Sequence, residues 1–274
     1  MRKVQGRLAG ALAGWLLLAT AGWAAPRILP SGPDVPANLL RIEIDLDRPL
    51  LRPLDMSRVA LFDERGRSIR VGLLDLPLAS RDGRKVTLLM DPGRLKTGVG
   101  PNVVLGLALH QGEWVTLSVS DPQLGTPLRK RWRVVPARRE RIVPQLWNLQ
   151  LPVAGGRDPL DVSFSYALGS SAAELIAIAA PNGERVVGAA MLTRGETHWR
   201  FVPARPWESG QYELRVHPSL EDVAGNRVCA AFEARKQFDE ACTREARVAF
   251  RARPRAGDFI DPGPDNPGRV EGVF

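Results

Sequence analysis

The chain has 274 residues, of which 44% are hydrophobic and 25% are charged, an ordinary composition for a globular protein. Three of its 38 basic residues lie within the first 24 residues, which leaves 35 basic against 30 acidic residues and a net charge of +5 for the remainder. So modest an excess is not a signature of nucleic-acid binding, and no nucleic-acid partner is expected.

The N-terminus has the three parts of a secretory signal peptide. Arg2, Lys3 and Arg7 make a positively charged start, residues 8–20 are apolar, and small residues lead to a cleavage site after Ala24. A retained membrane anchor is the alternative, although the apolar stretch is short for a span of about 20 residues. We expect an exported protein of the periplasm or cell envelope, with no stable membrane span after cleavage.

The first half reads as an extended, proline-containing leader (residues 25–36) followed by short strands. Residues 39–47 alternate, so that residues 40, 42, 44 and 46 share an apolar face, which predicts a half-buried strand. Further strands are predicted at residues 59–62, 69–74, 85–90 and 114–119. In the last of these, Trp114, Thr116 and Ser118 are expected on one side.

Residues 126–144 are predicted to connect two domains and are the most basic stretch of the chain. The predicted binding residues are Arg129, Lys130, Arg131, Trp132 and Arg133. Their cations could hold phosphate or carboxylate groups of an anionic glycan, of lipid head groups or of an acidic partner, and Trp132 could add stacking or a cation–π contact. The alternative is a solvated edge strand whose cations discourage edge-to-edge pairing.

The second half repeats the strand pattern of the first. Strands are predicted at residues 162–166, 175–179, 185–188, 198–202, 212–216, 227–234 and 246–252, with one helical turn within 170–175. The matching segments are Asn38–Leu50 with Asp158–Leu168, Val86–Pro92 with His198–Pro203, Gly112–Leu117 with Gly210–Leu214, and Asp121–Gly125 with Asp222–Gly225. Two copies of about one hundred residues, without a long helical pattern, predict an all-β protein.

The second copy resembles the bacterial Ig-like domains of surface-layer and other exported proteins. The resemblance rests on Trp199–Pro203, on Trp207–Val216 with its G-x-Y-x-L-x-V strand, and on Leu220–Asn226 with its D-x-A-G-N turn. It implies two tandem Ig-like β-sandwich domains after the signal peptide. The predicted division is signal peptide 1–24, first domain 25–136, second domain 137–253 and a disordered tail 254–274.

Cys229 and Cys242 are the two cysteines of the chain, and in an oxidising compartment we predict a disulfide between them. Two unpaired buried thiols are the alternative. In the chain-entropy model such a loop of about 14 residues contributes about 3 kcal/mol. A reducing agent should therefore lower the melting temperature of the second domain only, and unchanged melting under reductant would contradict the pairing.

Other polar and aromatic groups favour structural roles. Asp222 and Asn226 could ligate Ca²⁺, but such residues in a tight turn more often bond backbone amides. The three histidines, residues 110, 198 and 217, show no ligand spacing, so neither a metal site nor a cofactor is expected. No catalytic motif is present, which indicates a protein without catalytic residues that is not an enzyme.

The favoured hypothesis is therefore a non-enzymatic binding or scaffolding protein of the cell envelope. Its contact surfaces would be the sheet edges and the basic stretch, and its partner an envelope protein or an anionic cell-envelope component. The alternative is a glycan- or cell-wall-binding module that uses exposed tryptophans. That alternative predicts that Trp147 or Trp207 is accessible to solvent.

Overall fold

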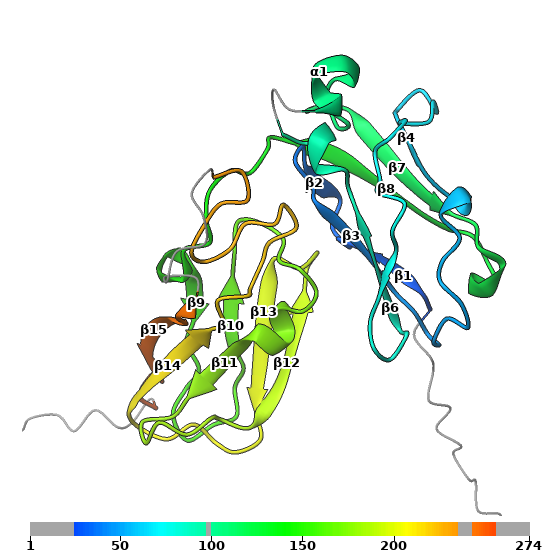
Figure 1. The fold of residues 1–274 in the computed structure, drawn as a ribbon. Coiled ribbons are helices and arrows are strands. Elements are labelled where there is room, and N and C mark those ends of the chain that lie inside the picture. Colours follow the sequence, from blue (N-terminus) through cyan, green and yellow to red (C-terminus); the bar gives the residue numbers. More distant parts are fainter. Residues whose placement is uncertain (1–24, 97–99, 235–242, 256–274) are drawn as a thin grey trace, which may run out of the picture.

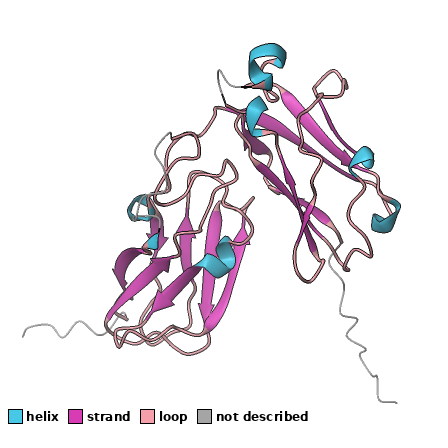
Figure 2. Ribbon diagram, viewed as in Figure 1, coloured by secondary structure: helices cyan, strands magenta, loops and turns pink. Residues whose placement is uncertain are grey.

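A computed structural model describes residues 25–96, 100–234 and 243–255. In this part of the chain strands dominate and every helix is short, as Figure 2 shows, so the predicted all-β class is confirmed. None of these helices is long and apolar enough to cross a lipid bilayer. The predicted signal peptide, Cys242 and residues 256–274 of the predicted tail lie outside the described residues.

Two four-stranded sheets form the N-terminal half, residues 25–135. The first has the order β1 (Arg27–Leu29), β3 (Arg41–Asp45), β6 (Lys85–Leu89), β5 (Leu78–Ala79), with all neighbours antiparallel. The second has the order β2 (Asp34–Pro36), β8 (Leu128–Val135), β7 (Trp114–Val119), β4 (Val59–Phe62). Here β2 runs parallel to β8, and the other pairs are antiparallel.

The C-terminal half, residues 141–255, repeats this arrangement with four and three strands (Figure 1). Its sheets have the orders β9 (Asn148–Gln150), β10 (Leu160–Ser163), β13 (His198–Pro203), β12 (Gly188–Thr193), and β11 (Ile176–Ala179), β14 (Gln211–Val216), β15 (Ala246–Arg251). If β9 to β15 are lettered A to G in chain order, the two sheets have the orders ABED and CFG. These are the strand orders of an immunoglobulin constant-type sandwich.

The strand orders of the two halves match at the segments that repeat in the sequence. β3 and β10 occupy the same place in their sheets, as do β6 and β13, and β7 and β14. The paired Asp–Gly turns also match. Asp121 and Asp222 are both buried, and each accepts the amide of the residue two positions on. The domain boundaries at residues 136 and 253 stay a prediction.

Short helices lie in the connections between strands. They are α1 (Pro101–Leu105) and α2 (Ala172–Leu175), with 3₁₀ turns η1 (Met56–Arg58), η2 (Pro92–Arg94), η3 (Pro122–Leu124) and η4 (Pro144–Leu146). The turn predicted within residues 170–175 is thereby confirmed as α2.

Each half has its own hydrophobic cluster. In the N-terminal half, the predicted apolar face of β3 and its flanks is buried, since Ile42 and Ile44 are at most 1% exposed. In the C-terminal half, Trp199 and Leu160 are fully buried. Tyr212 at the start of β14 accepts the amide of Glu208 at 2.8 Å and donates to its carbonyl at 3.1 Å, the tyrosine corner of Ig-like sandwiches.

Five expectations about secondary structure were wrong. Residues 69–74 form a turn and one isolated bridge, Leu73 with Met90, instead of a strand. The leader at residues 25–36 forms β1 and β2, because β2 pairs with β8. The basic stretch holds strand β8 instead of being only a connection: β8 pairs with β7 over Leu128–Arg133 and with β2 over Arg133–Val135. The strand predicted at residues 185–188 begins at Gly188 and continues to Thr193. Residues 227–234 form turns and one isolated bridge to Glu221 instead of a strand.

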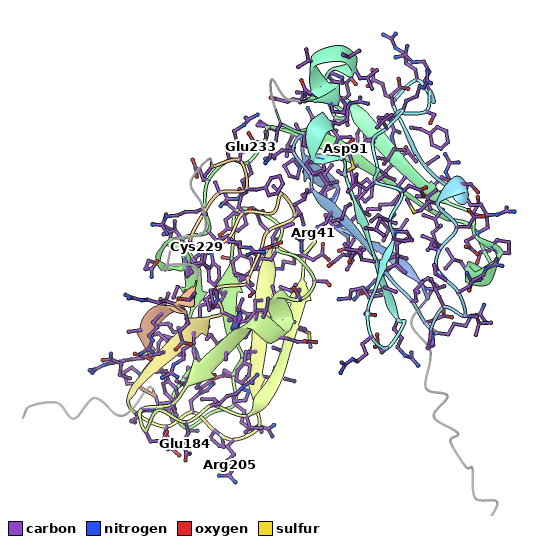
Figure 3. All side chains as sticks on the ribbon, in the orientation of Figure 1. Arg41, Asp91, Glu184, Arg205, Cys229 and Glu233 are labelled. Carbon is purple, nitrogen blue, oxygen red and sulfur yellow. The ribbon has the colours of Figure 1, made fainter. Side chains whose placement is uncertain are left out.

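The two halves meet through buried polar groups, near the labelled Arg41 in Figure 3. Three glutamates, each at most 9% exposed, bond across the junction. Glu43 accepts the amide of Ser170 at 3.0 Å, and Glu196 accepts both the amide and the hydroxyl of Ser31 at 2.7 Å. Glu221 pairs with Arg41. Since buried polar groups need defined partners, these contacts fix how the halves sit together.

The D-x-A-G-N turn belongs to this junction. Val223 packs into the N-terminal cluster, and its carbonyl accepts the amide of Leu40 at 2.9 Å. Asp222 accepts the amides of Ala224 and Asn226, both at 2.9 Å, so the turn interpretation of this segment is confirmed. The turn therefore joins the two halves.

At Gly195 the β12–β13 hairpin comes within van der Waals contact of the N-terminal half. A Cβ atom on Gly195 would lie 2.7 Å from the Gly32 Cα, and the Gly195 φ is +69°. Gly195→Ala should therefore cost about 2 kcal/mol in the free energy of unfolding, measured in urea. Gly183→Ala is the control, because Gly183 has φ +84° with nothing within 4 Å and carries only the backbone strain. Equal losses of unfolding free energy in the two variants would show that the close approach of Gly195 to Gly32 does not contribute.

Candidate functional site

The predicted binding residues divide between the two faces of β8. Successive side chains of a strand point to opposite faces. Arg129, Arg131 and Arg133 are exposed, whereas Lys130 is half-buried and Trp132 is fully buried. The run that looked continuous in sequence is therefore three arginines on one surface, spaced about 6.7 Å apart along the strand. We call Arg129, Arg131 and Arg133 the arginine face.

The neighbouring strand β7 completes this surface. Its register aligns Ser118 with Arg129, Thr116 with Arg131, and Trp114 with Arg133. Residues directly opposite on antiparallel strands share one face, so hydroxyl groups stand beside two of the arginines. The expectation that Trp114, Thr116 and Ser118 share a side is consistent with the alternating burial of β7.

Trp114 holds one arginine in place. The Arg131 guanidinium carbon lies 4.3 Å from the centroid of the Trp114 ring, a cation–π contact. Trp114 is 38% exposed. A stacked guanidinium keeps its N–H edges available for a carboxylate or phosphate, so the contact orients Arg131 without neutralising it.

Within the described residues, no carboxylate pairs with the arginine face. Arg129, Arg131 and Arg133 take part in none of the ion pairs there, although Asp34 on β2 is aligned with Arg133. By contrast, Arg200 on β13 is held by Asp161 at 2.7 Å. The arginine face thus presents three uncompensated charges, which is suited to an anionic surface.

The other two predicted residues have structural roles. Lys130 donates to the Ser31 carbonyl at 2.6 Å. Trp132 is 0% exposed, and its Nε1 donates to the Pro30 carbonyl at 2.8 Å. A side chain enclosed in this way cannot stack on a ligand, so Trp132 is a core residue and its assignment to the binding site was wrong.

The tryptophans proposed for a glycan site are also buried. Trp147 is 7% exposed and Trp207 is 2% exposed, and their indole N–H groups donate to the Tyr166 hydroxyl and to the Asp158 carbonyl. Trp207 packs edge-on against Tyr212 at 5.2 Å between ring centroids. The prediction of accessible tryptophans at these positions was wrong, because both rings fill the core of the C-terminal half.

Comparison with known proteins finds solved structures that are weakly similar to this chain but assigns it to no family. No family model matches the chain, and no curated protein matches its sequence. A chimeric titin Z1Z2 functionalised with a decorin peptide is 10% identical, with a TM-score of 0.27 over 84% of this chain and 97% of that chain. Titin Z1Z2 in complex with telethonin is 11% identical, with a TM-score of 0.22 over 84% and 98%. Because these TM-scores are low, the strand order carries the fold assignment.

The remaining candidate groups are the acidic residues, the histidines and the cysteines. In residues 25–96, 100–234 and 243–255, no three His, Cys, Asp or Glu side chains gather closely enough to hold a metal ion. His198 lies beside Arg194, and burial together with that cation lowers the pKa of its imidazole. Because Cys242 is outside the described residues, the Cys229–Cys242 pairing stays a prediction.

Proposed function

We propose that this chain is an exported, non-enzymatic binding or scaffolding protein of the periplasm or cell envelope, built from two tandem Ig-like domains. The arginine face is its contact surface, and an acidic surface of another envelope protein is its partner. The observation that carries the proposal is the set of three exposed arginines on one sheet with no carboxylate partner among the described residues.

Charge and rigidity support this assignment. The strand fixes the backbone of the three arginines, and stacking on Trp114 restrains the Arg131 side chain, so Arg131 loses less freedom on binding. Planar guanidinium groups bind carboxylates in a two-point geometry, which favours arginine over lysine at such contacts. The proposed disulfide between Cys229 and Cys242 would stabilise the other half and leave this surface unchanged.

In-cell crosslinking followed by mass spectrometry tests the proposal. We expect a discrete protein partner with the wild-type chain and its loss when Arg129, Arg131 and Arg133 are changed to serine. Capture should also weaken as the salt concentration rises, because exposed charges are screened.

The matched control is Arg185, Arg205 and Arg251 changed to serine, which removes the same charge from exposed positions of the C-terminal half. Figure 3 shows Arg205 at the end of that half away from the junction. The control should keep the partner. Equal loss in both variants would mean that net charge matters and the arginine face does not, and capture of wall material alone would contradict a protein partner.

A further inference from the structure

Arg94 is the one buried cation in the described part of the chain, with 5% of its surface exposed. Its guanidinium bonds backbone carbonyls only. Nε donates to Gly106 at 2.8 Å, Nη2 to Leu107 at 3.4 Å, and Nη1 to Arg70. Because a guanidinium has five N–H groups, these contacts use three of them.

A buried charge without a countercharge is costly, and proteins normally pair it. At the junction Asp222 pairs with Arg138, and Glu221 pairs with Arg41 and Arg227. Arg94 has no such partner, since no carboxylate of the described residues lies within ion-pair distance of its guanidinium. Carbonyl dipoles reduce the cost but leave a net positive charge beneath the surface.

A cavity of about 430 Å³ opens beside this guanidinium. It is lined by Arg94, Arg67, Arg70, His110, Glu113 and Trp114, among others. Three of these are cations, of which Arg67 is already held by Asp63 at 2.8 Å. The volume is that of a small-molecule site. Its lining includes Leu105 at the end of α1 and Trp114 at the start of β7, and Figure 1 shows both elements in the N-terminal half.

The backbone around Arg94 is fixed before any ligand arrives. Arg94 ends the 3₁₀ turn η2, and Asp91 Oδ1 caps that turn by accepting the Gly93 amide at 2.8 Å. Gly93 packs so closely on α1 that a Cβ atom there would lie 2.6 Å from Pro101. A guanidinium held in this way is preorganised for an anion.

We propose that the cavity binds a small sugar phosphate. Arg94 and Arg70 hold the phosphate oxygens by charge-assisted hydrogen bonds, and the phosphate supplies the countercharge that Arg94 lacks. Glu113 and His110 bond the sugar hydroxyls, and the exposed part of Trp114 packs against the apolar face of the sugar ring. Arg94 and Arg70 are not part of the arginine face, but Trp114 lines the cavity and also stacks with Arg131. The serine substitutions at residues 129 and 133 leave the cavity lining unchanged, whereas Arg131→Ser removes a contact of Trp114.

Isothermal titration of the purified protein tests this site with three probes. Glucose 6-phosphate should bind saturably, inorganic phosphate at least tenfold more weakly, and glucose without measurable heat. No saturable heat with glucose 6-phosphate would overturn the proposal. Equal affinity for glucose 6-phosphate and inorganic phosphate would overturn the role given to the sugar.

Three variants assign the binding to this cavity. Arg94→Gln and Arg70→Gln should each weaken glucose 6-phosphate binding tenfold or more, whereas Arg129→Gln, outside the cavity, should not change it. If Arg94→Gln fails to fold, Arg70→Gln and Trp114→Ala decide, because both side chains are exposed. Unchanged affinity in these variants would show that Arg94 only ties together the carbonyls of Arg70, Gly106 and Leu107.

Discussion

Asp222→Ala should lower the free energy of unfolding by about 3 kcal/mol, measured by urea denaturation. The carboxylate is 0% exposed and accepts four hydrogen bonds. They come from the amides of Ala224 and Asn226, from Asn226 Nδ2 at 2.9 Å, and from Arg138 Nε at 2.8 Å. Alanine would leave these donors without an acceptor at the junction of the halves.

Asparagine at position 222 should restore only part of the free energy of unfolding that alanine loses, and the electrostatics of Asp222 explain why. Burial raises the pKa of its carboxyl, while the hydrogen bonds from Asn226 and Arg138 lower it. Asp222→Asn keeps one oxygen acceptor but loses the charge opposite Arg138, so its loss should be intermediate. Asp82→Ala is the control, since exposed Asp82 accepts the Arg84 amide and the Ser80 hydroxyl in a similar turn. A loss as large at Asp82 would contradict the role of burial.

Trp132→Ala should cost about 3–5 kcal/mol, the usual range for removing a large buried aromatic side chain. The indole is fully buried and also bonds the Pro30 carbonyl, which ties β8 to the N-terminal leader. Thermal unfolding followed by circular dichroism measures the change. The size of this effect separates a core residue from a ligand-stacking residue, because a binding tryptophan contributes little to folding.

Trp114→Ala is the matched control for Trp132. Trp114 is on the adjacent strand, is 38% exposed, and contacts Arg131. Its replacement should cost less than about 1 kcal/mol, as is usual for partly exposed positions. If both variants melt at the same temperature, the inward orientation of Trp132 is wrong.

Alternation of apolar and polar residues was enough to locate much of the sheet structure. Residues 59–62 and 114–119 were predicted as strands with the bounds that β4 and β7 have. Their faces follow from a period of two, which depends only on neighbouring residues. The edge strand β12 was missed because Gly188, Ala189 and Ala190 have weak strand propensity, and pairing with β13 decides their conformation.

Features that depend on the partner half could not be read from local pattern. Alternation places Glu43 on the face opposite Ile42 and Ile44, yet it is 8% exposed and accepts the Ser170 amide of the other half. The basic stretch was recognised, but its division into an outward set and an inward set required the register with β7. Arg94 follows Pro92 and Gly93 and reads as an ordinary turn residue, since nothing local signals the carbonyls around it.

The three buried glutamates at the junction oppose bending between the two halves. Glu43, Glu196 and Glu221 would each be stripped of a bonded partner if the halves swung apart, so bending carries a cost at three separate points. A partner held on the arginine face would then set the position of the distant end of the C-terminal half, where Arg205 and Glu184 lie (Figure 3).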